Sequence, residues 1–208
     1  SKVNDKNELI KQESDYYLPR NFTPHGWAMH TLKNNLLIPS AGIDESNGNG
    51  YYILWPKNPV AAAKKIGQFL QKTYRIKNVG VVITDSHSIP LRRGVVGISL
   101  GAWGFNPLND YRGTPDIFGR TFHFSQTNIP DALAAATVFA MGEGSEQTPI
   151  AVISDVPLVS FWAQPQKKYT EFTALRVSIK EDLYSPFLTA VPWQKRKKGG
   201  KKRLPKTK

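Results

Sequence analysis

The sequence predicts an α+β fold (mixed α/β), because strand-like and helix-like segments alternate along the 208 residues. The stretch 79–84, VGVVIT, is a continuous apolar run of the kind found in buried strands. Asn58 and Pro59 predict the start of a helix, because Asn is a good N-cap and Pro suits the first helical position. One apolar stripe follows them. Apolar residues make up 40% of the chain, which is enough to form a buried core.

The first elements lie on either side of a glycine-rich stretch, IPSAGIDESNGNG at 38–50. Residues 7–18 predict a short helix that Pro19 ends, and the residues from there to position 35 are mixed and loop-like. The apolar run 36–38 predicts a strand leading into the glycine-rich stretch. The aromatic and β-branched run 51–55 predicts a strand leaving it.

A helix and two strands follow. The helix runs from Asn58 and Pro59 to about Tyr74, and its apolar stripe consists of Val60, Ala63, Ile66 or Gly67, and Leu70. The strand at 79–84 comes next, and we expect Asp85 just after its end. Residues 95–100 predict a further strand.

The C-terminal half contains fewer clear signals. Residues 101–120 are loop-rich, and a helix is predicted from about 130 to 141, with Gly142 just past its end. A strand at 149–154 and a short helix at 179–184 complete the predicted elements. No internal repeat is present.

The net charge of +12 is concentrated at the C-terminus. Residues 195–208 hold nine basic and no acidic residues, so the rest of the chain carries a net charge of only +3. We therefore expect one domain over 1–194 and a basic disordered tail over 195–208. The tail would bind RNA or an acidic lipid surface, or it would only aid solubility.

Several chemistries are excluded or lack support. The chain has no cysteine, so disulfides, thiolate catalysis and cysteine zinc sites are excluded, and this composition fits a cytoplasmic protein. No apolar run is long enough to cross a membrane, and no signal peptide is visible. Its four histidines lack zinc spacing, and there is no nucleophile elbow and no glycine-rich phosphate loop.

Acidic residues in loops are the best candidates for chemistry. Asp44 lies among glycines, Asp85 and Ser86 follow a predicted buried strand, and Glu143 lies between Gly142 and Gly144. Hard oxygen ligands of this type suit Mg²⁺ or Mn²⁺, which would neutralise nucleotide phosphates where no phosphate loop exists. Each acid could equally form an Asx-turn or a helix cap.

A second group combines acidic and basic residues. The segment LNDYRGTPDIFGR contains Asp110, Arg112, Asp116 and Arg120. Arginine beside carboxylate suits anionic substrates, because the guanidinium fork matches phosphate and carboxylate groups. We expect these four residues to bind an anionic substrate.

Five segments occur in an order that resembles the coenzyme F(420)-0:γ-glutamyl ligase family, including bacterial relatives linked to folate metabolism. They are AGIDESN at 41–47, ITDSHSIPLRRG at 83–94, LNDYRGTPDIFGR at 108–120, DALAAATVFAMGEG at 131–144, and the following Pro149. The resemblance covers residues 36–153, which is more than half of the chain.

The resemblance implies a GTP-dependent ligase in the class of acid–amino-acid ligases. GTP would phosphorylate a carboxylate of the acceptor, coenzyme F(420)-0 (a deazaflavin) or a folate-like molecule, and the amino group of L-glutamate would attack the acyl phosphate. The family uses two divalent metal ions, Mg²⁺ or Mn²⁺, and works as a homodimer. Its mixed α+β fold implies mixed sheets flanked by helices.

The resemblance also implies site residues, where positions of this sequence match the family's motifs. The metal ligands fall on Asp44, Asp85, Ser86 and Glu143, and a nucleotide contact falls on Asn47. A loop over 141–148 would wrap the nucleotide, with contacts at Met141, Gly142, Gly144, Ser145, Glu146, Gln147 and Thr148.

The chain also departs from the family pattern. Ser86 stands where relatives have Thr, His87 and Ser88 stand where they often have Gly nearby, and Leu91 stands where they often have Trp. An N-terminal segment with further guanine-nucleotide contacts is expected to be lacking before Ser1. Two alternatives therefore stay open: a module that binds RNA or an acidic surface through its tail, and a truncated, inactive relative that binds metal.

Overall fold

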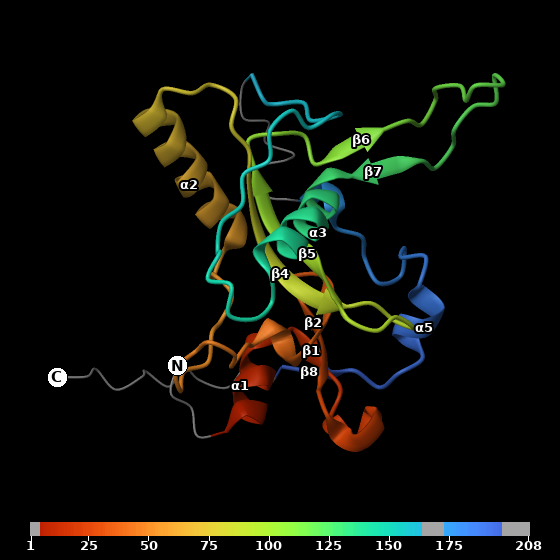
Figure 1. Cartoon of the computed structure of the whole chain (residues 1–208). Coiled ribbons are helices and arrows are strands. Elements are labelled where there is room, and N and C mark those ends of the chain that lie inside the picture. Colours follow the sequence, from red (N-terminus) through yellow and green to blue (C-terminus); the bar gives the residue numbers. More distant parts are fainter. Residues whose placement is uncertain (1–4, 164–172, 197–208) are drawn as a thin grey trace. The chain divides into compact units, whose positions relative to one another are not determined.

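The computed structural model describes residues 5–163 and 173–196, and it divides into two compact units (Figure 1). Unit 1 comprises Ser1–Ile43, Gly50–Tyr52 and Ser178–Lys208, and unit 2 comprises Asp44–Asn49 and Ile53–Val177. The sequence analysis had treated residues 1–194 as one domain.

Unit 1 is built on a four-stranded antiparallel sheet with strand order β3-β2-β1-β8. Its strands are β1 (Tyr16–Tyr17), β2 (His30–Lys33), β3 (Leu36–Pro39) and β8 (Gln194–Lys195). Helix α1 (Lys6–Glu13) begins at the Asp5 cap and contributes the buried residues Leu9 and Ile10. The unit also contains the 3₁₀ turns η1 (Arg20–Phe22), η2 (Pro24–Gly26) and η3 (Ser40–Gly42), and helix α5 (Ser185–Thr189).

Several predictions in this unit need correction. The first helix ends at Glu13 rather than at position 18, because the Tyr16–Tyr17 pair hydrogen-bonds to strands on both sides. Strand β2 lies in the stretch predicted to be loop, and the strand at 36–38 is confirmed as β3. Residues 179–184 form turns rather than a helix, and α5 follows with a proline in its first turn.

The predicted basic tail begins inside ordered structure. Lys195 ends β8, and the backbone N–H of Arg196 donates to the carbonyl of Asp15 at 3.2 Å. The other residues of that tail, 197–208, lie outside the described residues.

Unit 2 centres on the antiparallel pair β4 (Val81–Ser88) and β5 (Val95–Trp103), against which α2 (Pro59–Tyr74) and α3 (Ile129–Met141) pack (Figure 1). A second antiparallel pair, β6 (Leu108–Asp110) and β7 (Gln126–Asn128), forms the base of a long hairpin arm, and η4 covers Thr173–Leu175. Both helices confirm the sequence signals, since Asn58 caps α2 and Gly142 ends α3.

The strands of unit 2 differ from the prediction in extent. Strand β4 continues to Ser88, so Asp85 lies within the strand opposite Ile98 and not after its end. The predicted strand at 51–55 reduces to one bridge between Ile53 and Asp44. Residues 149–154 form no strand, and two of them, Ile150 and Val152, are 79% and 92% exposed.

The α+β class is confirmed, and the sheets of the described residues are antiparallel. Hairpins account for this arrangement, because β2–β3 and β4–β5 are joined by short connections that cannot link parallel strands.

Glycines allow the helices of unit 2 to approach the β4–β5 pair closely. A Cβ at Gly97 in β5 would lie 2.1 Å from the carbonyl oxygen of Ala134 in α3, and one at Gly67 in α2 would lie 2.2 Å from the Trp103 ring. Real Cβ contacts are never this short, so α3 packs with its backbone directly against β5. A register shift of β4 against β5 at Ile83/Thr84 lies between the parts of β5 that contact the two helices.

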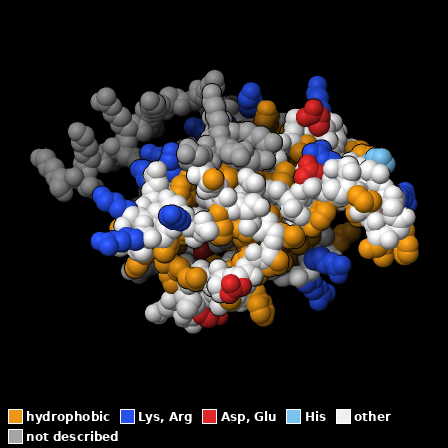
Figure 2. All heavy atoms as spheres, turned by 90° about the horizontal axis from the view of Figure 1, so that it is seen from above, with side chains coloured by type: hydrophobic (Ala, Val, Ile, Leu, Met, Phe, Trp, Pro, Cys, Tyr) orange, Lys and Arg blue, Asp and Glu red, His pale blue; other side chains and the backbone are white. Residues whose placement is uncertain are grey.

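Apolar side chains are exposed on the hairpin arm, which lies at the right of the view in Figure 2. Ile117, Phe118 and Phe124 are 91%, 88% and 92% exposed. Within the described ranges, the structure contains no helix with the length and apolar character that crossing a membrane requires.

We predict that Gly97→Ala destabilises the protein by about 1–3 kcal/mol, the usual cost of overpacking a filled core. The added methyl group would force α3 away from β5 because it meets a main-chain carbonyl rather than a flexible side chain. Urea denaturation measures this cost. Val95→Ala, at the exposed end of the same strand, is the control and should shift stability by less than about 0.5 kcal/mol. Equal effects of the two substitutions would contradict the packing argument.

Candidate functional site

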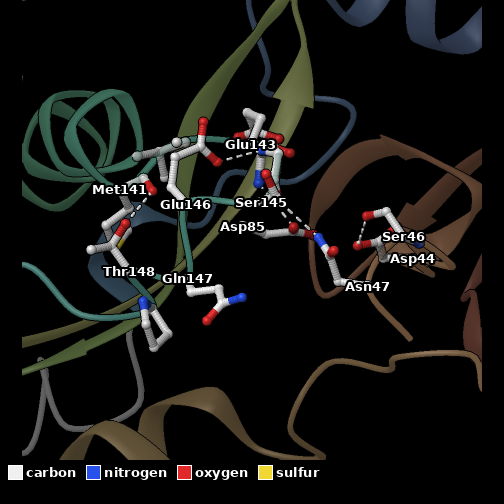
Figure 3. A pocket seen from close by; sticks show the side chains of 15 residues that line it. Asp44, Ser46, Asn47, Asp85, Met141, Glu143, Ser145, Glu146, Gln147 and Thr148 are labelled. Atoms are coloured by element: carbon white, nitrogen blue, oxygen red, sulfur yellow. Dashed lines mark hydrogen bonds between the residues drawn. The ribbon is translucent and has the colours of Figure 1, made fainter. Parts of the chain in front are cut away.

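A cavity of about 680 Å³ lies in unit 2 and brings together three separate parts of the chain. These are the turn at 44–47, the middle of β4 at 85–86, and the end of α3 with its following loop at 138–149 (Figure 3). Its volume falls in the range of small-molecule and cofactor sites. The lining residues are Asp44, Ser46, Asn47, Asp85, Ser86, Val138, Met141, Gly142, Glu143, Gly144, Ser145, Glu146, Gln147, Thr148 and Pro149.

The cavity therefore contains every residue that the sequence analysis assigned to metal or nucleotide binding. Ser46, Val138 and Pro149 line it as well, although no prediction gave any of the three a binding role. Convergence of these segments could not be inferred from spacing, because they lie up to about a hundred positions apart.

The cavity wall is strongly acidic. Asp44, Asp85, Glu143 and Glu146 contribute carboxyl groups, and none of the described residues that line the cavity is lysine, arginine or histidine. An anionic ligand would be repelled here unless cations were bound with it, because charges of like sign oppose one another.

The Asp44 carboxylate is fixed by its own turn. Its Oδ1 accepts from the backbone N–H groups of Glu45 at 2.6 Å and Ser46 at 2.8 Å, and Oδ2 accepts from the Ser46 hydroxyl at 2.7 Å. The backbone of Asp44 exchanges two hydrogen bonds with Ile53. Asp44 thus forms the expected Asx-turn, with two donors on Oδ1 and one on Oδ2.

The Asp85 carboxylate is held from two sides in the middle of β4. The indole N–H of Trp55 donates to Oδ2 at 2.6 Å, and the backbone N–H of Ser86 donates to Oδ1 at 2.8 Å. Burial raises the pKa of Asp85; the hydrogen bonds from Trp55 and Ser86 act against this rise, and the negative charges of Asp44 and Glu143 add to it. The three acids therefore interact electrostatically.

Sequence reasoning missed Trp55, which it placed only at the end of a predicted strand. The side chain is buried, with 9% of its surface exposed, but its N–H reaches a site carboxylate. No local pattern signals this contact, because the two residues are thirty positions apart.

Hydrogen bonds shape the loop that follows α3. Gly142 adopts a φ of +81° at the end of the helix, where its N–H donates to the carbonyl of Val138. The Glu146 carboxylate accepts from the N–H of Gly144 at 2.7 Å, and the Thr148 hydroxyl donates to the carbonyl of Met141 at 2.7 Å. These bonds fold the loop over the cavity and place Glu143 at its edge (Figure 3).

Asn47 connects this loop to the turn that carries Asp44. Its side-chain N–H donates to the carbonyl of Gly144 at 2.9 Å, across 97 positions of sequence (Figure 3). Gly144 is thus bound through its N–H by Glu146 and through its carbonyl by Asn47.

The chemistry of the lining residues fits a hard divalent cation. Asp44, Asp85, Glu143 and the Ser86 hydroxyl present the oxygen ligands that Mg²⁺ and Mn²⁺ prefer. As they stand, however, no three acidic or histidine side chains of the described residues converge closely enough to hold one ion. The donor set fits such an ion, and binding would have to draw the carboxylates together.

The four residues predicted to bind substrate lie on the hairpin arm and do not line the cavity. Arg112 donates to both carboxylate oxygens of Asp110, which lowers the pKa of Asp110 to about 2. Asp116 accepts from the backbone N–H groups of Phe118 and Arg120 in a tight turn. The structure shows local partners for these acids, and their substrate role stays a prediction.

Comparison with known proteins identifies similar sequences. The profile of the family F420-0:Gamma-glutamyl ligase matches residues 2–155. The coenzyme F420:L-glutamate ligase of Methanococcus maripaludis is 32% identical over 156 residues, covering 75% of this chain and 58% of that protein.

Two other archaeal proteins of the same name show similar identities. The one from Methanopyrus kandleri is 36% identical over 122 residues, and the one from Methanocaldococcus jannaschii is 38% identical over 121 residues. Each match covers 58% of this chain and 48% of the relative. The chain therefore spans about half the length of the curated relatives it matches.

We predict that Asn47→Ala loosens the loop after α3 without unfolding the protein. The substitution removes an exposed hydrogen bond, for which a loss of about 1 kcal/mol or less is expected. Hydrogen exchange should become faster at the amides of residues 143–146. Asn49→Ala, in the same glycine-rich turn, is the control and should leave those amides unchanged. Similar exchange in both variants would show that Asn47 does not fix the loop.

The raised pKa of Asp85 predicts a specific pH dependence of stability. Its protonated form is favoured in the folded chain, so its stabilising effect is complete below the ordinary pKa of 3.8 and is lost as pH rises through the raised pKa. The free energy of unfolding of the wild type relative to Asp85→Asn should therefore fall from acid to neutral pH. Denaturation at several pH values, with a metal chelator present, measures this difference in unfolding free energy. A difference that does not change with pH would contradict a raised pKa of Asp85.

Proposed function

The chain belongs to the F420-0:gamma-glutamyl ligase family, and on that premise we propose that it joins L-glutamate to a carboxylate of a coenzyme F420-0-type acceptor with GTP as the energy source. The observation that carries this proposal is the acidic cavity. It combines Asp44, Asp85 and Glu143 with a glycine-rich loop at the end of α3.

The proposed reaction has two steps. An oxygen of the acceptor carboxylate attacks the γ-phosphorus of GTP, the bond to the bridging oxygen breaks, and GDP leaves. The uncharged amino group of L-glutamate then attacks the carbonyl carbon of the acyl phosphate. Phosphate leaves, the nitrogen loses a proton, and an amide bond remains. Phosphoryl transfer of this kind needs alignment and charge neutralisation more than covalent chemistry from the protein.

Divalent cations would supply that neutralisation by binding phosphate oxygens of the nucleotide. Asp44, Asp85, Glu143 and the Ser86 hydroxyl are the residues that we propose to hold them. The four carboxylates of the wall support this assignment, because a nucleotide without cations would meet only negative charge there.

The loop at 141–148 is the proposed nucleotide contact, together with Asn47. Apart from Met141 its residues are small or polar, and the Gly144 N–H already donates to an anionic oxygen, that of the Glu146 carboxylate. Asn47 already binds the Gly144 carbonyl, so one side chain would connect the nucleotide loop to the Asp44 turn.

The names of the relatives support the choice of acceptor. All three relatives above are named for coenzyme F420, so an F420-0-type molecule is the first candidate and a folate-like molecule is the alternative. We also propose that the chain forms a homodimer and acts in the cytoplasm. On the hairpin arm, the residues proposed to bind glutamate or the acceptor are Asp110, Arg112, Asp116 and Arg120.

We predict that the purified chain, supplied with GTP, L-glutamate, Mn²⁺ and coenzyme F420-0, forms a product heavier by one or more glutamyl residues. Mass spectrometry detects it directly. Asp44→Asn and Asp85→Asn should each slow turnover roughly 10²- to 10³-fold, the usual effect of losing charge stabilisation in a reacting site.

Glu45→Gln is the matched control, because Glu45 neighbours Asp44 but does not line the cavity. It should retain turnover. Full activity of both aspartate variants would refute the proposed site. A wild-type chain that binds Mn²⁺ but forms no product would instead favour the inactive relative.

A further inference from the structure

A three-residue segment, Ile53–Trp55, contacts both aspartates of the proposed cation site. Ile53 pairs with Asp44 through two backbone hydrogen bonds, Asp44 N–H to Ile53 O at 3.2 Å and Ile53 N–H to Asp44 O at 2.9 Å. Two residues later, the indole N–H of Trp55 donates to Asp85. The backbone of one aspartate and the side chain of the other are thus fixed from the same short segment.

The contact at Asp85 is geometrically well defined. The Trp55 N–H to Oδ2 distance is 2.6 Å, and Oδ1 accepts from Ser86 at 2.8 Å. With one donor on each oxygen, rotation of the carboxylate about its own axis is restricted. The second lone pair of each oxygen then points in a fixed direction.

An indole is well suited to fixing a carboxylate. Its ring is rigid, it donates but cannot accept, and at 9% exposure it is anchored by burial. Burial also protects the hydrogen bond from competition with water, so the bond is more persistent than an exposed one.

We propose that Trp55 is a positioning residue for the divalent-cation site, holding the Asp85 carboxylate in the orientation that binds the ion. This inference rests on the proposed function, because that function places a cation at Asp85. Hydrogen-bonding partners of metal ligands typically change metal affinity about 10- to 100-fold when they are removed.

A purely structural role is the alternative to exclude, because any buried indole benefits from an acceptor. Trp103 provides the comparison within the same unit. It is also buried, with 5% of its surface exposed, and its indole N–H has no hydrogen-bond partner among the described residues. Removing the N–H at position 103 therefore removes no contact to a site carboxylate.

The test replaces Trp55 in the full-length chain with benzothienylalanine, which keeps the shape of tryptophan but has sulfur in place of N–H. Calorimetric titration with Mn²⁺ alone should show roughly 10- to 100-fold weaker binding than in the wild type. Replacing Trp55 with 5-fluorotryptophan, which keeps the N–H, should restore affinity. Benzothienylalanine at position 103 should leave it unchanged.

The outcomes separate the inference from the function on which it rests. Unchanged Mn²⁺ affinity with benzothienylalanine at position 55, together with weakened binding in Asp85→Asn, would overturn the role of Trp55 and keep the cation site. Absence of Mn²⁺ binding by the wild type would overturn both. The expected affinity pattern in a chain without ligase activity would support Trp55 and refute the proposed reaction.

Discussion

The close packing of α3 against β5 is the constraint on which the site depends. At Gly97 the main chain of the helix occupies the space that a Cβ would need, so the helix lies directly against the β4–β5 pair. Helix α3 leads straight into the loop that carries Glu143, while Asp85 lies in β4, the partner strand of β5. The distance between these two acids is therefore set by a helix–strand contact and not by the loop alone.

Given that packing, the cavity concentrates negative charge at a cost to stability. Asp85 is partly buried within a strand, and the charges of Asp44 and Glu143 oppose its ionisation. The fold compensates with local donors, from Ser86 and Trp55 to Asp85 and from Glu45 and Ser46 to Asp44. These donors orient the carboxylates but do not remove their charge. Negative charge without a counterion from the protein is expected at functional sites and not in a core selected for stability alone.

The parts of this structure that the sequence predicts are those specified by local signals. Asn58 with Pro59 and Gly142 mark the limits of α2 and α3, because caps act within one turn of a helix. The extent of β4 could not be predicted, because Asp85 to Ser88 lie in a strand only through pairing with 95–98. The same reason applies to residues 149–154, which have an apolar pattern but pair with no strand in the part of the chain that the structure describes. Trp55 was missed because its contact with Asp85 is entirely tertiary.

The acids of the hairpin arm and those of the cavity show how an acid that only forms a turn differs from one that can bind a ligand. Asp44, Asp110 and Asp116 all form turns by accepting backbone N–H groups, so the turn itself decides nothing. Asp110 has its cation on the same hairpin, since Arg112 binds both oxygens and lowers the pKa to about 2.

In the cavity, by contrast, the acids lack a counterion among the lining residues that the structure describes. Asp85 shares the wall with three other acids, its pKa is raised, and no basic residue belongs to the described lining. An acid whose counterion comes from the same chain needs no ligand, whereas a group of acids without one favours binding a cation from solution. Residues 44–47 therefore form a turn in either case, and the charge balance of the cavity wall is what makes Asp44 a candidate ligand.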